Sequence, residues 1–368
     1  MSLDLFVRAI LGYLPVAAFI FGLAHLAVNI SPTEAENVEP AQSLDAAALD
    51  QLCVQADGYS RKGEFERAKA LFQQAIEPGL ETLSSDYSVA LECVLGLART
   101  FRDEGRYNRA LPLNLHALHV SSHAYGKDHE LTFQSMNDLA AVLLAQGRLL
   151  EAERLLTQLI RDAQGVLADD HMVSLTARVN LGELYSASNR FAEAGSMLTS
   201  ALERQQGSQG DRRWLTPIIL GHLSQLHRAQ GNLDAAEKEA KRGYEMSLDI
   251  WGERHWVSAA LDMNVGQVYM VQKRYDQAER TLQRALDLQR QLLGEQHPLS
   301  LTALDALGRL RIYQSRYRDA AATLTQALAM RRAVLGESHP DTLLTAEHLA
   351  AAESKLSSGG SQSTGRSI

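Results

Sequence analysis

Cysteine, proline and aromatic residues are scarce in this 368-residue sequence. Two cysteines are too few for a disulfide scaffold or a cysteine-rich metal site, and they do not indicate a compartment. Eight prolines are fewer than turn-rich β folds need, and 6% aromatic residues are fewer than compact cores usually hold. The net charge of −8 argues against general nucleic-acid binding. An Ala- and Leu-rich chain with these deficits is typical of an all-α fold.

Charged side chains are missing from residues 9–33, and residues 9–28 are almost wholly apolar. Twenty residues of helix rise about 30 Å, which matches the hydrocarbon core of a bilayer. We therefore predict that residues 1–30 are an N-terminal hydrophobic helix that serves as a transmembrane anchor. A cleavable signal peptide and a helix packed against protein are the alternatives. Arg8 is the only basic residue before the span, and no small-residue cleavage site closes it, which favours the anchor.

Basic residues around the span predict its orientation. Arg8 and the terminal amine lie before it, and the next basic residue is Arg61. The positive-inside rule then keeps the N-terminus in the cytoplasm. We expect a single-pass membrane protein whose remaining chain lies on the extracytoplasmic side, periplasmic or lumenal.

Acidic residues are concentrated directly after this span. Residues 31–57 contain six acidic side chains and no basic one, and we assign residues 31–43 to an acidic linker. Residues 1–30 balance at zero, so −6 of the net charge falls in residues 31–57 and −2 on residues 58–368. Because residues 58–368 are nearly neutral, a partner that binds them need not be basic.

A six-residue pattern recurs seven times after the linker. Its first positions are residues 63, 105, 147, 189, 231, 273 and 315, so every interval is 42 residues. That position is mostly Gly and predicts a left-handed turn between two antiparallel helices. The third position is aromatic or Leu, and the sixth is always Ala, which predicts a close helix crossing. The copies run from Gly63-Glu-Phe65-Glu-Arg-Ala68 to Ser315-Arg-Tyr317-Arg-Asp-Ala320.

A second pattern, Gly-x-x-His, lies between these units at the same period. The Gly predicts the end of one helix, and a Ser or Thr at 132, 174, 216, 258, 300 and 342 predicts a hydroxyl cap for the next. The histidines could be metal ligands, but because each junction has only one, they should not converge on a single ion. We predict that they stabilise the turn locally. They are His129, His171, His255, His297 and His339.

Together these residues resemble the tetratricopeptide repeat with 42-residue units, as in kinesin light chain and nephrocystin arrays. HEAT and armadillo repeats have similar periods, but the Gly–aromatic–Ala turn favours the tetratricopeptide family. The resemblance covers residues 44–356 and implies a right-handed α-solenoid of seven helix-turn-helix repeats. Residues 341–356 would be a C-terminal capping helix, and residues 357–368 a disordered Ser/Gly tail.

The first helix of each repeat is expected to line the concave side of such a solenoid. The resemblance implies that Asn180 and Asn264 hydrogen-bond the backbone of an extended peptide, while His222 departs from the family pattern. Other polar side chains on the same face can donate and accept hydrogen bonds, which suits the main chain of a bound peptide. The full predicted set is Asn180, Asn264, His222, Asp138, Glu183, Gln225, Gln267, Arg228, Arg99, Arg102 and Arg309.

Enzymatic signatures are missing, so we predict neither catalysis nor a cofactor. His116, His119 and His123 share a helix face at metal-ligand spacing, yet a solvated face is the simpler interpretation, and we predict no metal. Cys53 and Cys93 are read as small core residues.

The predicted function is a membrane-anchored scaffold or assembly adaptor that binds a protein or peptide partner. The alternative is a structural subunit or spacer of a membrane complex that uses its convex or edge surfaces.

Overall fold

The computed structural model describes residues 46–82, 88–206 and 211–363 of the chain, and these residues confirm the all-α prediction. They form 15 α-helices and one short 3-10 helix, with no strand among them. The predicted span at residues 9–28 and the linker at 31–43 lie outside the described residues. Within the described residues, every helix is too short or too polar to cross a membrane.

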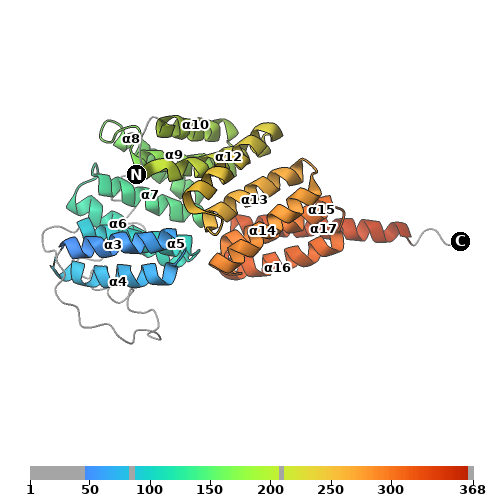
Figure 1. The fold of residues 1–368 in the computed structure, drawn as a ribbon, viewed down its shortest axis with the longest axis horizontal. Coiled ribbons are helices and arrows are strands. Elements are labelled where there is room, and N and C mark those ends of the chain that lie inside the picture. The colour runs from blue at the N-terminus through green and yellow to red at the C-terminus, as the bar shows by residue number, and fades with distance from the viewer. Residues whose placement is uncertain (1–45, 83–87, 207–210, 364–368) are drawn as a thin grey trace. The chain divides into compact units, whose positions relative to one another are not determined.

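The chain divides into two compact units, Met1–Ala168 and Asp169–Ile368. Figure 1 shows the helices of both units. The first unit contains six helices, which are α3 (Ala46–Arg61), α4 (Phe65–Thr82), α5 (Ser88–Asp103), α6 (Tyr107–Ala124), α7 (Glu130–Ala145) and α8 (Leu149–Ala163). The second contains α9 (Met172–Ala187), α10 (Phe191–Gln206), η1 (Asp211–Trp214), α11 (Leu215–Ala229), α12 (Leu233–Trp251), α13 (Trp256–Val271), α14 (Tyr275–Leu293), α15 (Pro298–Tyr313), α16 (Tyr317–Leu335) and α17 (Pro340–Ser363).

Helices alternate in role along each unit. We call the odd-numbered helices the A helices and the even-numbered ones the B helices. Within a unit, each A helix packs against the B helix that follows it and against the next A helix. The predicted close crossing is confirmed, because the recurring alanine at the start of each B helix is fully buried. These residues are Ala68, Ala110, Ala152, Ala194, Ala236, Ala278 and Ala320.

The turn from each A helix to its B helix has the predicted left-handed backbone. All seven first positions of the six-residue pattern have positive φ, including Asn189 at 59°, Lys273 at 63° and Ser315 at 61°. Gly adopts this conformation without steric cost, whereas a side chain with Cβ is strained there. The conformation is therefore imposed by helix packing even where the sequence does not supply Gly.

The junction from each B helix to the next A helix confirms the local role of the histidines. His129, His171, His255, His297 and His339 accept a hydrogen bond through Nδ1 from the backbone N–H two residues later, at 3.2–3.4 Å. Each imidazole thereby caps an amide that has no partner inside the helix.

The Ser and Thr hydroxyls at these junctions were predicted to cap free amides of the next helix, and this prediction was wrong. Thr132, Ser258 and Ser300 donate to the carbonyl of the Gly six residues earlier, at 2.7–2.8 Å. The imidazole already occupies the amide, so the hydroxyl instead satisfies the carbonyl that the ending B helix leaves open.

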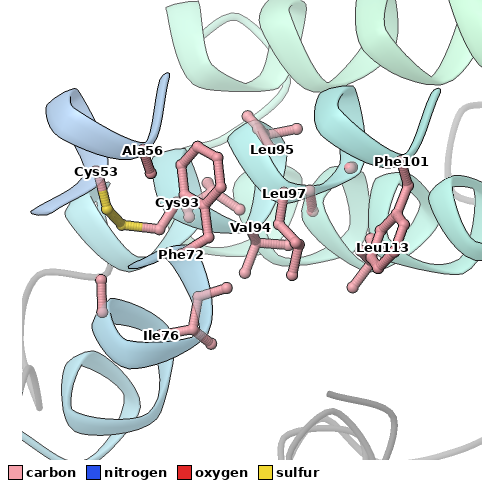
Figure 2. Packing of buried hydrophobic residues seen from close by; sticks show 14 of the residues in the cluster. Cys53, Ala56, Phe72, Ile76, Cys93, Val94, Leu95, Leu97, Phe101 and Leu113 are labelled. Atoms are coloured by element: carbon pink, nitrogen blue, oxygen red, sulfur yellow. A yellow bond between two sulfur atoms is a disulfide. The ribbon is translucent and has the colours of Figure 1, made fainter. Parts of the chain in front are cut away.

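Cys53 and Cys93 are buried, as predicted, but they are joined in a disulfide that the sequence analysis did not anticipate (Figure 2). Cys53 lies on α3 and Cys93 on α5, and their Cα atoms are 5.4 Å apart. Around them, the core of the first unit gathers Phe72 from α4 and Leu97 and Phe101 from α5. The bond covalently links two neighbouring A helices.

Two further predictions need correction. His116 is buried, at 4% exposure, rather than on a solvated face, because it lies on the side of α6 that packs into the unit. Helix α17 continues to Ser363, into the segment predicted to be a disordered tail from residue 357. No B helix follows it within the described chain, so nothing packs back to enforce a turn near residue 357.

Candidate partner-binding surface

The predicted partner-binding side chains lie on the A helices at two positions three residues apart, with two arginines one turn further on. We call this set the A-helix stripe. It comprises Arg99 and Arg102 on α5, Asp138 on α7, Asn180 and Glu183 on α9, His222, Gln225 and Arg228 on α11, Asn264 and Gln267 on α13, and Arg309 on α15.

In the first unit, the stripe is an ion-pair network. Arg99 donates to Asp138 of the next A helix at 3.0 Å and lies 3.5 Å from Asp57 of the preceding one. Burial opposes the charge of Arg99, but these two carboxylates outweigh it and raise the pKa of its guanidinium. Arg102 pairs with Asp103 at 2.8 Å. Both cations are therefore neutralised by the protein's own acids.

In the second unit, the stripe is more amide-rich. Gln225 donates from Nε2 to Asn264 Oδ1 at 3.1 Å, and His222 Nε2 lies 3.9 Å from Glu183 Oε2. Asn180 is half-buried on α9. Each of these contacts, like Arg99–Asp138, joins a residue to the one 39 positions later on the next A helix. The stripe is thus a ladder whose rungs connect consecutive A helices within a unit.

The ladder stops beyond α13. The residue 39 positions after Gln267 is Ala306, which cannot form a rung, and Gln267 is only 7% exposed. The residue 39 positions after Arg309 is His348, but its Nδ1 pairs with Asp305 Oδ1 at 3.1 Å instead. In the described part of the chain, neither Gln267 nor Arg309 has a side-chain hydrogen bond.

Arg228 lies beside this interruption. It is half-buried on α11, and among the described residues its guanidinium has no hydrogen bond or ion pair. Burial, together with repulsion from Arg309, lowers its pKa to about 10, against a small opposing effect of Tyr313. The helices that carry the two arginines, α11 and α15, both pack against α13.

Asp57 and Asp305 are the acidic partners that the sequence analysis missed. Asp57 precedes Arg99 by 42 residues, so the repeat period itself places it on the stripe. Asp305 lies outside both stripe positions, and no periodic signal indicates its contact with His348.

Two surface hollows, of about 760 and 680 Å³, are lined by other residues, so neither contains the stripe.

Metal binding finds no support in the described residues, which contain no group of three or more His, Cys, Asp and Glu side chains able to hold an ion. The rings of His119 and His123 are tilted at 45° with their centroids 4.3 Å apart, while His116 is buried. The three histidines on α6 therefore do not converge on one exposed point.

Solved structures share this helical fold. A Rap protein complexed with competence and sporulation factor is 14% identical, with 84% of this chain and 88% of that chain covered, at a TM-score of 0.57. A signal transduction ATPase with a tetratricopeptide repeat sensor from Pyrococcus horikoshii is 12% identical, covering 83% and 44%, at 0.50. BtubC from P. vanneervenii is 18% identical, covering 68% and 93%, at 0.46. At these identities, the likeness concerns the fold alone.

No curated protein matches the sequence at a significant level. The family model described as tetratricopeptide repeat matches residues 90–165, 139–207, 173–249 and 257–333, which together span more than half of the chain. These matches run through both units and agree with the alternation of A and B helices. The chain belongs to the tetratricopeptide repeat family.

Proposed function

We propose that this protein is a membrane-anchored interaction scaffold that holds an extended segment of a partner protein along its A helices. The full array would comprise seven repeats and a capping helix in a right-handed solenoid, with the stripe on its concave side. The repeat fold supports protein–protein interaction in general.

The observation that carries this proposal is unused hydrogen-bonding capacity on the stripe. Asn264 is 6% exposed and accepts from Gln225 through Oδ1, while its Nδ2 has no acceptor among the described residues. The Gln267 amide is equally buried. Buried amides normally have partners, and an amide that can both donate and accept matches the N–H and C=O groups of an extended main chain.

Replacing Asn180 and Asn264 by Ala together should reduce capture of the partner in affinity purification from membranes, read by mass spectrometry. Asn108→Ala on the exposed side of α6 is the matched control. Thermal melting checks that each variant folds. If the folded double variant captures the same proteins in the same amounts, the stripe is not the binding surface.

Extracytoplasmic location of the repeats is the second part of the proposal. The uncharged residues 9–28 support an anchor, and the Cys53–Cys93 disulfide is typical of an oxidising compartment. In intact spheroplasts or vesicles, added protease should reach the repeats only from the extracytoplasmic side, and both cysteines should resist alkylation until they are reduced. Alkylation of both without reductant would contradict this location.

A structural subunit that uses its edges is the alternative. Leu343 and Leu344 on α17 are 52% and 45% exposed, in the helix that has no B helix packed after it within the described residues. Under this alternative, replacing both leucines by Ser would abolish partner capture, and the Asn180/Asn264 variant would not.

A further inference from the structure

A surface hollow of about 680 Å³ in the second unit is lined by residues of α12, α13 and α14. We call it the α12–α14 hollow. Its lining includes Tyr244 from α12, Asp262 from α13 and Arg284 from α14. None of the residues that line it belongs to the A-helix stripe. The hollow is therefore a separate surface, and its chemistry does not depend on the proposed groove.

Two residues of this hollow are exceptions to the repeat. At the position of Tyr244, the six other copies at 42-residue intervals all carry Leu or Ile. At the position of Asp262, four other A helices carry buried apolar residues, which are Val94, Met136, Leu220 and Leu304. Arg178 is the only other charged residue at that position. The hollow thus has a phenol and a carboxylate where most copies of the repeat have hydrocarbon.

Asp262 is the one buried charge in this lining. It is 3% exposed, whereas the other charged residues of the hollow are exposed or half-buried. Arg284 donates to both carboxylate oxygens of Asp262, at 2.7 and 2.8 Å, but the Arg284 side chain is 62% exposed. Burial outweighs this pairing and raises the pKa of the Asp262 carboxyl. A hydrated guanidinium therefore compensates the buried carboxylate only in part.

Tyr244 lies in the same negative surroundings. Its hydroxyl forms no hydrogen bond with the residues that the structure describes. Burial, followed by the charge of Asp262, raises the pKa of the Tyr244 phenol, with a smaller opposing effect of Arg284. Glu253, which is exposed and has no ion pair within the described chain, adds to the increase. The surroundings of both groups favour an added cation.

We propose that the α12–α14 hollow binds the ammonium group of a lysine side chain carried by a partner protein, with Asp262 as its buried counter-charge. Arg284 already uses one lone pair of each Asp262 oxygen, so the remaining ones suit a compact ammonium better than a second planar guanidinium. The Tyr244 hydroxyl oxygen is a further acceptor. A volume of about 680 Å³ exceeds what one ammonium group fills, which leaves room for the segment that carries it.

The next repeat supplies a variant that lacks the site. Leu304 and Gln326 occupy there the positions of Asp262 and Arg284. Asp262→Leu combined with Arg284→Gln copies this arrangement and removes one charge of each sign, so the net charge stays at −8. Since apolar packing in place of a buried ion pair is often neutral or stabilising, the variant should melt no lower than the wild type. A lower melting temperature would show that the carboxylate serves the fold, which would overturn the proposal.

Three labelled nine-residue peptides test the ligand by fluorescence anisotropy on the full-length chain. Each consists of Gly and Ser with blocked ends and one central residue, which is Lys, Gln or Glu. The Lys peptide should bind at least tenfold more tightly than the Gln peptide, and less tightly as salt rises. Equal binding of these two would overturn the proposal. Tighter binding of the Glu peptide, through the exposed Arg254 and Arg280 of the hollow, would overturn it as well.

The charge-neutral variant, Asp262→Leu with Arg284→Gln, should weaken binding of the Lys peptide at least tenfold. Arg190→Gln combined with Glu193→Gln is the matched control, because it removes an ion pair at the start of α10 and should have no effect. Unchanged affinity in the charge-neutral variant would contradict the site. Free butylamine should displace the labelled peptide only at higher concentration than the unlabelled Lys peptide does. Displacement at the same concentration would reject a protein as the source of the ammonium group.

Discussion

At the scale of single residues, ionisable side chains are held by neighbours that the repeat places nearby. Burial alone would raise the pKa of the Glu237 carboxyl, but hydrogen bonds from Lys241, Gln272 and Arg274 outweigh it and lower the pKa to about 2. The same arrangement returns 42 residues later at Glu279, whose pKa is also lowered. These carboxylates fasten a B helix to the A-to-B turn of the following repeat.

His116 is the opposite case, because its surroundings disfavour charge. Burial in α6, reinforced by His119, lowers the pKa of the His116 imidazole from 6.5 to about 4. Between these two values, the unfolded chain binds a proton that the folded chain does not. The stability of the first unit should therefore fall as pH decreases from about 6.5 toward 4.

Replacing His116 by Gln should remove this acid-linked loss. The pKa difference corresponds to about 3 kcal/mol, so the variant should gain up to that amount relative to wild type between pH 7 and pH 4. Urea unfolding at several pH values measures the effect. His123→Gln, on the exposed part of α6, is the control. A constant difference between wild type and His116→Gln across this range would contradict the assignment.

At the scale of elements, each repeat begins and ends with its own local chemistry. Helix B stops at a Gly of positive φ, such as Gly252 or Gly294, and the next A helix starts with a histidine cap. Capping by Nδ1 places the ring proton on Nε2, and a doubly protonated ring cannot accept the bond at all. The junctions are therefore defined by side-chain hydrogen bonds as well as by packing.

His129 allows the cap to be measured with little loss of packing, since its side chain is exposed. His129→Ala should lower the free energy of unfolding by about 1 kcal/mol, because the Leu131 N–H loses its acceptor. His129→Asn should retain most of that stability, since an Asn side chain also caps. Urea unfolding, with hydrogen exchange of the first turn of α7, gives both values. Equal loss in the two variants would show that the cap is not the source.

At the scale of the whole molecule, the disulfide acts on only one of the two units. It closes a loop across 40 residues of the first unit, linking α3 to α5. Chain-entropy arguments assign about 4 kcal/mol to a loop of that length. In repeat arrays, stability is shared mainly between neighbouring repeats, so the effect should stay near the bond.

Reducing the disulfide should therefore destabilise the N-terminal repeats selectively. Hydrogen-exchange mass spectrometry should show faster exchange in α3, α4 and α5 after reduction, with α13–α16 unchanged. A Cys53→Ala and Cys93→Ala double variant should exchange like the reduced protein. Uniform acceleration across both units would mean that the disulfide stabilises the chain in another way.

The sequence by itself determined the helical class, the turns and the buried alanines. The reason is that a strict 42-residue period repeats the same local requirements, so each copy supports the others. Even Lys273 and Ser315 adopt the left-handed turn that the Gly copies predicted. The sequence also placed the histidines correctly at the junctions. It did not show that the imidazole accepts from the backbone amide while the Ser or Thr hydroxyl donates to a carbonyl, because residue spacing does not define hydrogen-bond geometry.

Only the tertiary structure decided which stripe residues are paired. Rungs such as Gln225–Asn264 join side chains 39 positions apart, and their formation depends on how consecutive A helices are staggered. The Cys53–Cys93 bond similarly depends on a Cα separation of 5.4 Å between two helices. Where His348 pairs with Asp305 and Ala306 interrupts the ladder, Arg228 and Arg309 form no ion pair with any residue that the structure describes. Periodicity predicts the face on which a side chain lies, whereas its partner depends on packing between helices.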